Sequence, residues 1–72
     1  MNVIEITTEY IKLQDLLKLA SVAATGGEAK IMVQNGDVLV NGEICTQRGR
    51  KIRPGDDVLA NGQHYTVKYA DQ

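Results

Sequence analysis

Aromatic residues are scarce in this 72-residue sequence, which contains three tyrosines and neither tryptophan nor phenylalanine. Proteins that hold single-stranded nucleic acids commonly stack successive bases on several exposed aromatic rings. So few rings cannot supply a broad platform of that kind. The composition therefore argues against recognition of a long single strand through its bases.

Cysteine and histidine are each present once, as Cys45 and His64. One cysteine cannot form an intramolecular disulfide, and the two residues together offer too few ligands for a Cys/His metal site. We therefore expect a reducing compartment, no metal and no cofactor. Catalysis needs a base beside a nucleophile or a second acid, and the sequence offers no evident pair. We interpret Cys45 as a small buried residue that ends a strand, and His64 as a partly exposed strand residue.

Long apolar runs are also missing. No stretch approaches the 18 apolar residues of a membrane span, and the first ten residues lack the basic start and apolar run of a signal peptide. A chain of this length has room for one domain, residues 1–72, whose core is too small to enclose a large cofactor. We expect a cytoplasmic monomer without membrane contact.

Helical patterns are confined to the first half of the chain. Residues 3–6 favour a short strand with Ile4 and Ile6 on one face. Thr7 or Thr8 could then cap a helix, since an apolar stripe with helical spacing follows. That stripe consists of Leu13, Leu16, Leu17 and Ala20.

A second helix of about nine residues is predicted between Thr25 and Asn35-Gly36. Thr25 and Glu28 have the spacing of a capping box, and Gly36 suits the left-handed position that follows a helix. The expected buried face consists of Ala29, Met32 and Val33, which leaves Ile31 turned outward.

Turn dipeptides divide the second half into short strands. Asn41-Gly42 and Asn61-Gly62 predict two tight hairpins, and Pro54-Gly55 predicts a type II turn. Asp56 and Asp57 could suggest a pair of catalytic carboxylates, but after that turn we interpret them as acceptors for local backbone N–H groups. The predicted fold class is α+β, with an N-terminal strand, two short packed helices, and then antiparallel strands joined by hairpins.

Basic residues are few, yet half of the eight gather within six positions, as Arg48, Arg50, Lys51 and Arg53. The net charge is −1, and the rest of the chain has four basic and nine acidic side chains. A solvated loop kept for solubility is one interpretation. Phosphate binding is the other, because arginine forms bidentate contacts with phosphate oxygens. In extended backbone the first two and the last two of these residues face opposite sides, unless Gly49 bends the chain.

The start of the second predicted helix is another candidate for an anion. Gly26 and Gly27 occupy its first positions, where N–H groups lack partners within the helix, and Lys30 lies one turn further. The spacing is not that of a phosphate-binding P-loop. Taken alone, these residues favour a capped helix start packed closely on its neighbour.

The order of these elements resembles the S4-type RNA-binding domain, also called the αL motif, over residues 11–58. The pairing of "VNG" with "PGD" at this spacing is the more specific part of the match. With one further strand at each end, the chain is similar to the small stand-alone bacterial S4-domain proteins of the YaaA and YbcJ type. The shared residues are Leu13, Leu16, Leu17, Glu28-Ala29-Lys30, Gly36, Val38, Val40-Asn41-Gly42 and Pro54-Gly55-Asp56.

The resemblance implies a surface, formed by the two helices and the following hairpin, that binds structured RNA through its backbone. Arg53 is added from charge clustering, and Gly26 and Gly27 from their N–H groups. The positions carried over from the family are Lys12, Thr25, Lys30, Arg48, Arg50 and Lys51.

The leading hypothesis is a non-catalytic module that contacts the phosphates of structured RNA, such as ribosomal RNA or a tRNA-like element. The family implies a place in ribosome assembly or translation, with a ribosomal or other protein partner left open. The alternative is a protein-interaction adaptor that uses the same basic surface, together with Ile31, against an acidic partner. An enzyme acting on a small phosphorylated molecule is a third hypothesis, for which we find neither a base nor a pocket.

Overall fold

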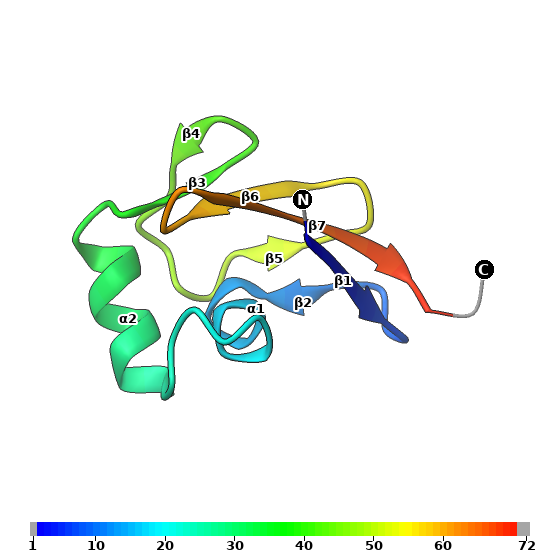
Figure 1. The fold of residues 1–72 in the computed structure, drawn as a ribbon, viewed down its shortest axis with the longest axis horizontal. Helices are drawn as coiled ribbons and strands as arrows, with labels where there is room; N and C mark the ends of the chain where they lie inside the picture. The colour runs from blue at the N-terminus through cyan, green and yellow to red at the C-terminus, as the bar shows by residue number, and fades with distance from the viewer. Residues whose placement is uncertain (1, 71–72) are drawn as a thin grey trace.

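The computed structural model describes residues 2–70, in which strands and two helices build an α+β fold, as predicted (Figure 1). No helix of this part of the chain is long and apolar enough to span a membrane. The elements are β1 (Asn2–Ile6), β2 (Ile11–Lys12), α1 (Leu13–Leu19), α2 (Gly26–Gln34), β3 (Val38–Val40), β4 (Glu43–Ile44), β5 (Lys51–Ile52), β6 (Asp57–Ala60) and β7 (Gln63–Tyr69).

The strands form two sheets. The larger has the order β1-β7-β6-β3-β4, and the smaller consists of β2 and β5. Neighbours in the larger sheet are antiparallel except β1 and β7, which pair in parallel with Ile4 opposite Val67. The sheet is therefore mixed: the antiparallel strands predicted after the helices are present, and the N-terminal strand, whose pairing was not predicted, joins them in parallel. A parallel pair needs a crossover connection, and the helices and inner strands lie within it.

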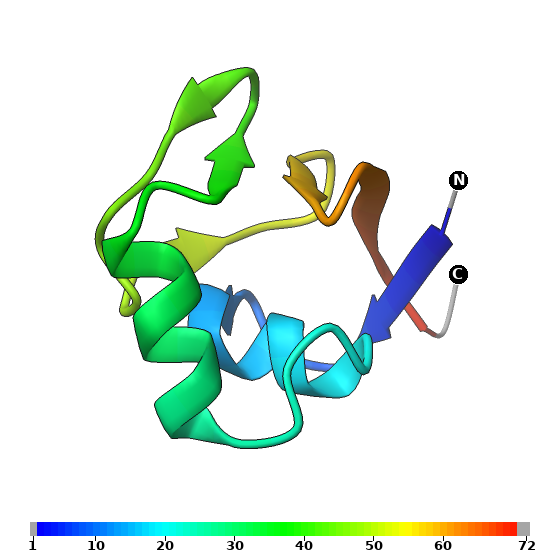
Figure 2. The ribbon, with the colours of Figure 1, turned by 60° about the vertical axis from the view of Figure 1, so that its left-hand side comes forward.

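The helices pack against each other on one side of the larger sheet (Figure 2). In α2 the predicted capping box is present: the Thr25 hydroxyl accepts a hydrogen bond from the Glu28 N–H at 3.2 Å, and the Glu28 carboxylate accepts one from the Ala24 N–H at 3.1 Å. Gly36 follows the helix with a φ of 80°, as expected. Ala29 and Val33 are buried and Met32 is partly buried, while Ile31 is 59% exposed.

The predicted start of the first helix was wrong. Neither Thr7 nor Thr8 caps it, since α1 begins at Leu13 and the Thr8 hydroxyl donates to the Tyr10 carbonyl at 2.7 Å. Instead of continuing a helix, Ile11 and Lys12 pair with β5. The pairing of two segments far apart in the sequence, with Ile11 packed on the core, outweighs the local capping signal.

The first N–H groups of α1 are satisfied by residues 48–53, which we call the basic segment. The Leu13 N–H donates to the Arg50 carbonyl at 2.9 Å, and the Gln14 N–H donates to the Arg48 carbonyl at 3.0 Å. Lys12, the N-cap residue, makes no side-chain capping bond. Because the first N–H groups of a helix have no partner within it, these two bonds replace a capping side chain.

The turn dipeptides are placed as predicted. Asn41-Gly42 joins β3 to β4 and Asn61-Gly62 joins β6 to β7, all four residues having positive φ. Gly55 has a φ of 96° after Pro54, and the Asp56 N–H donates to the Arg53 carbonyl across this turn at 2.9 Å. These features agree with the predicted type II turn.

The hydrophobic core lies between the helices and the sheets. Cys45 is buried in it, as predicted, and its thiol donates to the Gln47 carbonyl at 3.6 Å. Ile52 joins β5 to this core, so the small sheet is anchored on its inner side. The largest fully buried side chains are Leu13, Leu16, Leu17, Ile52, Val33, Val38, Val40 and Val58.

Two leucines of α1 allow a matched test of this core. Leu16 is fully buried, whereas Leu19 is 59% exposed. We expect Leu16→Ala to lower the free energy of unfolding by about 2–5 kcal/mol, because it removes buried methylenes and leaves a cavity. Leu19→Ala should change it by less than about 0.5 kcal/mol. Urea unfolding followed by circular dichroism measures both, and equal losses would contradict the described packing of α1.

Candidate functional site

The small sheet separates an apolar inner face from a basic outer face. Its register places Ile11 opposite Ile52 and Lys12 opposite Lys51. Opposed residues share a face and successive residues alternate, so Lys12 and Lys51 project away from the buried Ile52. Two like charges directly opposite each other destabilise a strand pair. A bound anion would offset this repulsion.

Tyr10 and Arg53 extend the outer face by one further pair. Each lies two residues from one of the opposed lysines, which puts it on the same side of its chain. The contacts agree, because Lys51 Nζ lies 5.0 Å and Arg53 Cζ lies 5.9 Å from the centre of the Tyr10 ring. Both distances are within the range of cation–π interactions. We refer to Tyr10, Lys12, Lys51 and Arg53 as the basic strip.

Sequence reasoning missed Tyr10. It stands two positions before Lys12, and this spacing would have placed the two on one face if residues 10–12 had been taken as extended. The helix predicted from Thr7 or Thr8 hid that relation. Lys51 and Arg53 do share one side, as predicted.

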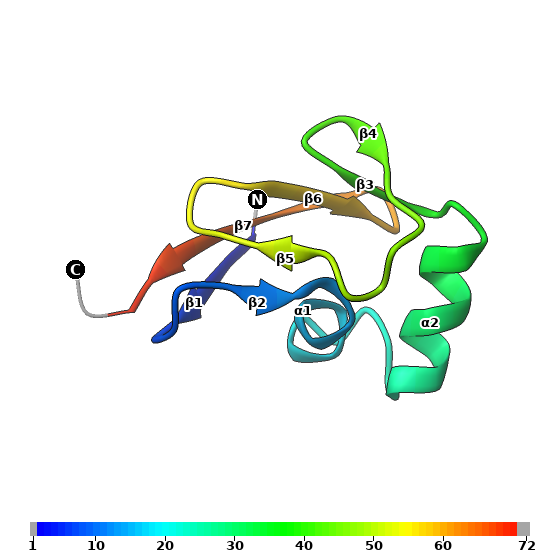
Figure 3. The same ribbon diagram turned by 180° about the vertical axis from the view of Figure 1, so that it is seen from behind.

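Arg48 and Arg50 lie in the turn that leads into β5. The Arg50 N–H donates to the Gln47 carbonyl at 3.1 Å, so the chain turns at Arg48 and Gly49. Both arginines are exposed, and their carbonyls hold the start of α1 beside Lys12. Figures 1 and 3 show β5 running next to β2, which leads directly into α1. The four clustered cations and Lys12 are thereby brought into one region.

The other predicted residues lie at the start of α2 and form a separate group. The whole length of α1 lies between them and Lys12 along the chain. Thr25 uses its hydroxyl for capping, as described above. A side chain at Gly26 would meet nothing within 4 Å, and one at Gly27 only the Thr25 hydroxyl at 3.7 Å. The helix start is capped as expected, but it is not closely packed at these glycines. Lys30 is exposed.

Asp56 and Asp57 have different roles. Asp56 accepts from the Arg53 N–H at 2.8 Å, as expected of a turn residue, and also from the Asn41 side chain at 3.1 Å. Asp57 lies in β6 instead, and its carboxylate lies 2.9 Å from His64 Nδ1. The prediction that Asp57 accepts from local backbone N–H groups was therefore wrong, because strand pairing brings β7 beside it.

Within residues 2–70, the hydrogen bonds around His64 and Asp57 lead only to amide and carboxylate groups. Asn41 accepts from the Asp57 N–H at 2.9 Å and donates to Asp56. The hydrogen bonds described for residues 2–70 do not extend this network to a hydroxyl or a thiol. We therefore interpret it as a link between strands that also fixes the backbone of Arg53. Within the same residues, no three His, Cys, Asp or Glu side chains gather as a metal site would need.

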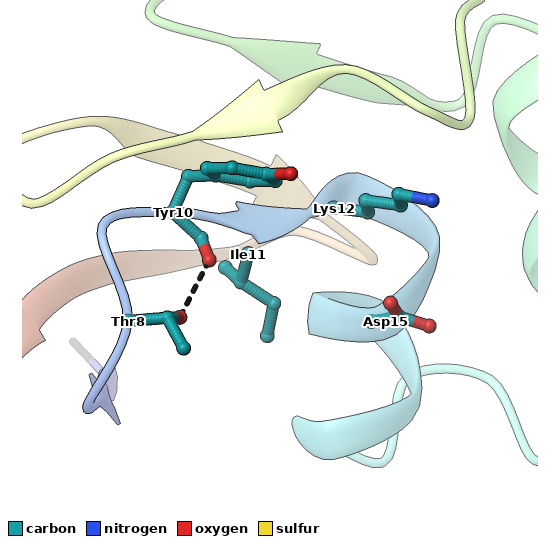
Figure 4. A pocket seen from close by; sticks show the side chains of 5 residues that line it. All are labelled: Thr8, Tyr10, Ile11, Lys12 and Asp15. Carbon is teal, nitrogen blue, oxygen red and sulfur yellow. Dashed lines mark hydrogen bonds between the residues drawn. The ribbon is translucent and has the colours of Figure 1, made fainter.

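A cavity of about 470 Å³, broadly open to solvent, lies beside the basic strip. Figure 4 shows its lining, with the Tyr10 ring and Lys12 on the side of β2 and Asp15 on the first turn of α1. The side chains of Thr8 and Ile11 complete it. Asp15 also pairs with Lys18 at 3.4 Å.

Comparison with known proteins places this arrangement in a family. The model of the S4 domain family matches residues 4–68, which include β2, α1, α2 and β5. This chain belongs to the S4 domain family. The S4-type fold predicted from the sequence is confirmed, including its two helices and the hairpin that follows them.

Two bacterial relatives of this S4 domain have names that mention ribosomes or RNA. "Probable ribosome maturation protein RlbA" of Bacillus subtilis is 48% identical over 61 residues, covering 85% of this chain and 86% of the relative. "Putative RNA-binding protein YbcJ" of Escherichia coli is 36% identical over 58 residues, covering 81% and 83%. The predicted similarity to proteins of the YbcJ type is thus confirmed.

A solved structure shows the same fold inside a larger protein. The 30S ribosomal protein S4e of Thermoplasma acidophilum matches with a TM-score of 0.67 and 27% identity, over 92% of this chain. This S4 domain spans 35% of the ribosomal protein's length.

Two glycines, one within the basic segment and one just after it, allow a matched test of the backbone there. Gly55 has a φ of 96°, which strains any residue with a side chain, whereas Gly49 has open space around it and no φ in that range. We expect Gly55→Ala to lower the free energy of unfolding by about 1–2 kcal/mol. Gly49→Ala should be neutral or raise it by up to about 1 kcal/mol, because alanine restricts the unfolded chain. Thermal unfolding of both variants measures the difference, and the reverse order would contradict the two turns.

Proposed function

We propose that this protein binds the phosphate backbone of structured RNA and works without a reaction of its own, in the maturation of the ribosome. The observation that carries the proposal is the basic strip, in which Lys12 and Lys51 stand directly opposite each other. A polyanion offsets their repulsion along the whole face. Membership of the S4 domain family supports RNA as the ligand, and the names of the two bacterial relatives support a ribosomal setting.

The proposed contacts form two regions. The main region combines Lys12, Lys51 and Arg53 of the basic strip with Arg48 and Arg50 in the turn before β5. Arginine suits phosphate because its guanidinium forms two parallel hydrogen bonds to the oxygens. Such contacts fix the position of the protein on a folded RNA without reading its sequence.

The second region is the start of α2. We propose that the N–H groups of Gly26 and Gly27, with Thr25 and Lys30, approach a further phosphate of the same RNA. Open space at both glycines leaves the backbone accessible, while Glu28 in the same turn opposes an anion. This region should therefore contribute less to affinity than the main region.

A single lysine can test the main region. We expect binding to purified bacterial ribosomal RNA to weaken as salt rises, with a slope of log K against log salt of roughly −3 to −4.5 for four or five phosphate contacts. Lys51→Gln should reduce the magnitude of this slope by about 1, because one phosphate contact is lost. Fluorescence anisotropy at several salt concentrations measures the slope.

Lys68→Gln is the matched control, because Lys68 is an exposed lysine of β7 outside both regions. Its slope should equal that of the native protein. If both variants behave like the native protein, the basic strip is not the RNA contact. A protein that co-purifies after nuclease treatment, together with absent RNA binding, would favour the adaptor hypothesis instead.

A further inference from the structure

The cavity beside Tyr10 combines a cation with two kinds of group that phosphate binding alone does not need. Tyr10 contributes an aromatic ring, Asp15 a carboxylate that is 45% exposed, and Lys12 a cation at the rim. Its volume of about 470 Å³ lies within the range of roughly 300–1,000 Å³ that is usual for sites of small ligands.

Tyr10 differs in its surroundings from the other tyrosines. Tyr65 is buried in the core, and Tyr69 lies at the end of β7. Tyr10 is partly exposed, lines the cavity, and has two cations within 6 Å of its ring centre. Both cations lie over the ring, so a base that stacks there takes their place on the ring while they bind the adjoining phosphates.

The carboxylate gives the cavity a chemical preference. An ionised carboxylate only accepts hydrogen bonds, so Asp15 favours a base that carries an amino group. The backbone N–H groups of Leu13 and Gln14 are not available to hydrogen-bond the base, because they already donate to the Arg50 and Arg48 carbonyls. The selectivity therefore depends on the side chains of the cavity.

We propose that this cavity takes one unpaired, amino-bearing nucleotide of the RNA, with its base stacked on Tyr10 and its amino group donating to Asp15. This inference rests on the proposed function, because the phosphates on either side of that nucleotide are held by the basic strip. It adds local sequence preference to a surface that otherwise recognises only the backbone. The rest of the RNA remains structured, and a single base leaves its stack.

The test compares two RNA hairpins that differ only in the stem. In one the stem is fully paired, and in the other it contains a single unpaired guanosine. We expect the native protein to prefer the second hairpin by roughly 5- to 150-fold, the range that one base stacked on an aromatic ring provides. Tyr10→Leu should remove most of this preference, and Tyr10→Phe should keep it. Tyr69→Leu is the matched control and should keep it as well. Fluorescence anisotropy at fixed salt gives all the affinities.

Asp15→Asn provides a second test, which does not depend on whether Tyr10→Leu folds. With the native protein we expect tighter binding when the unpaired nucleotide is guanosine than when it is uridine, and Asp15→Asn should narrow that difference. Equal binding of both hairpins by the native protein would overturn the cavity proposal and leave the proposed function standing. Retained preference in a folded Tyr10→Leu would also overturn it. If neither hairpin binds, the proposed function fails first.

Discussion

The start of α1 depends on the main chain of a distant segment. Leu13 is fully buried, and its N–H finds its acceptor in the Arg50 carbonyl, while the Gln14 N–H bonds to the Arg48 carbonyl. A buried donor without a partner would destabilise the fold by about 1–3 kcal/mol. The helix and the basic segment therefore form one unit. Arg48 and Arg50 are held at the surface by their own backbones, which leaves their side chains available to a ligand.

This arrangement also concentrates positive charge in a chain whose net charge is −1. The positive end of the helix dipole lies beside Lys12, next to the strand that carries Lys51. Asp15 in the first turn is the nearby negative charge, and it pairs with Lys18. Separation of charge over the surface can steer a polyanion toward one side of a small protein even when its total charge is slightly negative.

Most of the fold could be predicted because its signals are local. Thr25 and Glu28 cap α2, and Asn-Gly pairs form the hairpins, through contacts within a few residues. The remaining features arise from pairing across long distances in the chain, which periodicity does not reveal. The sequence located the clustered cations, but their relation to Tyr10 depends on β2 meeting β5, and that strand lies where a helix was expected. The parallel neighbour of β7 was missed for the same reason.

The parallel pair of β1 and β7 has a consequence for the order in which the chain folds. Asn2 lies opposite Tyr65, so the first strand of this domain pairs with its last strand. The helices and the hairpins consist of nearer contacts and can form while synthesis continues. Until β7 is complete, β1 has no partner, and Ile4 and Ile6, which pack on the core of the folded protein, remain in contact with water. Closure of the larger sheet is therefore expected to be the late step, and the folding domain is most exposed to misassociation along β1.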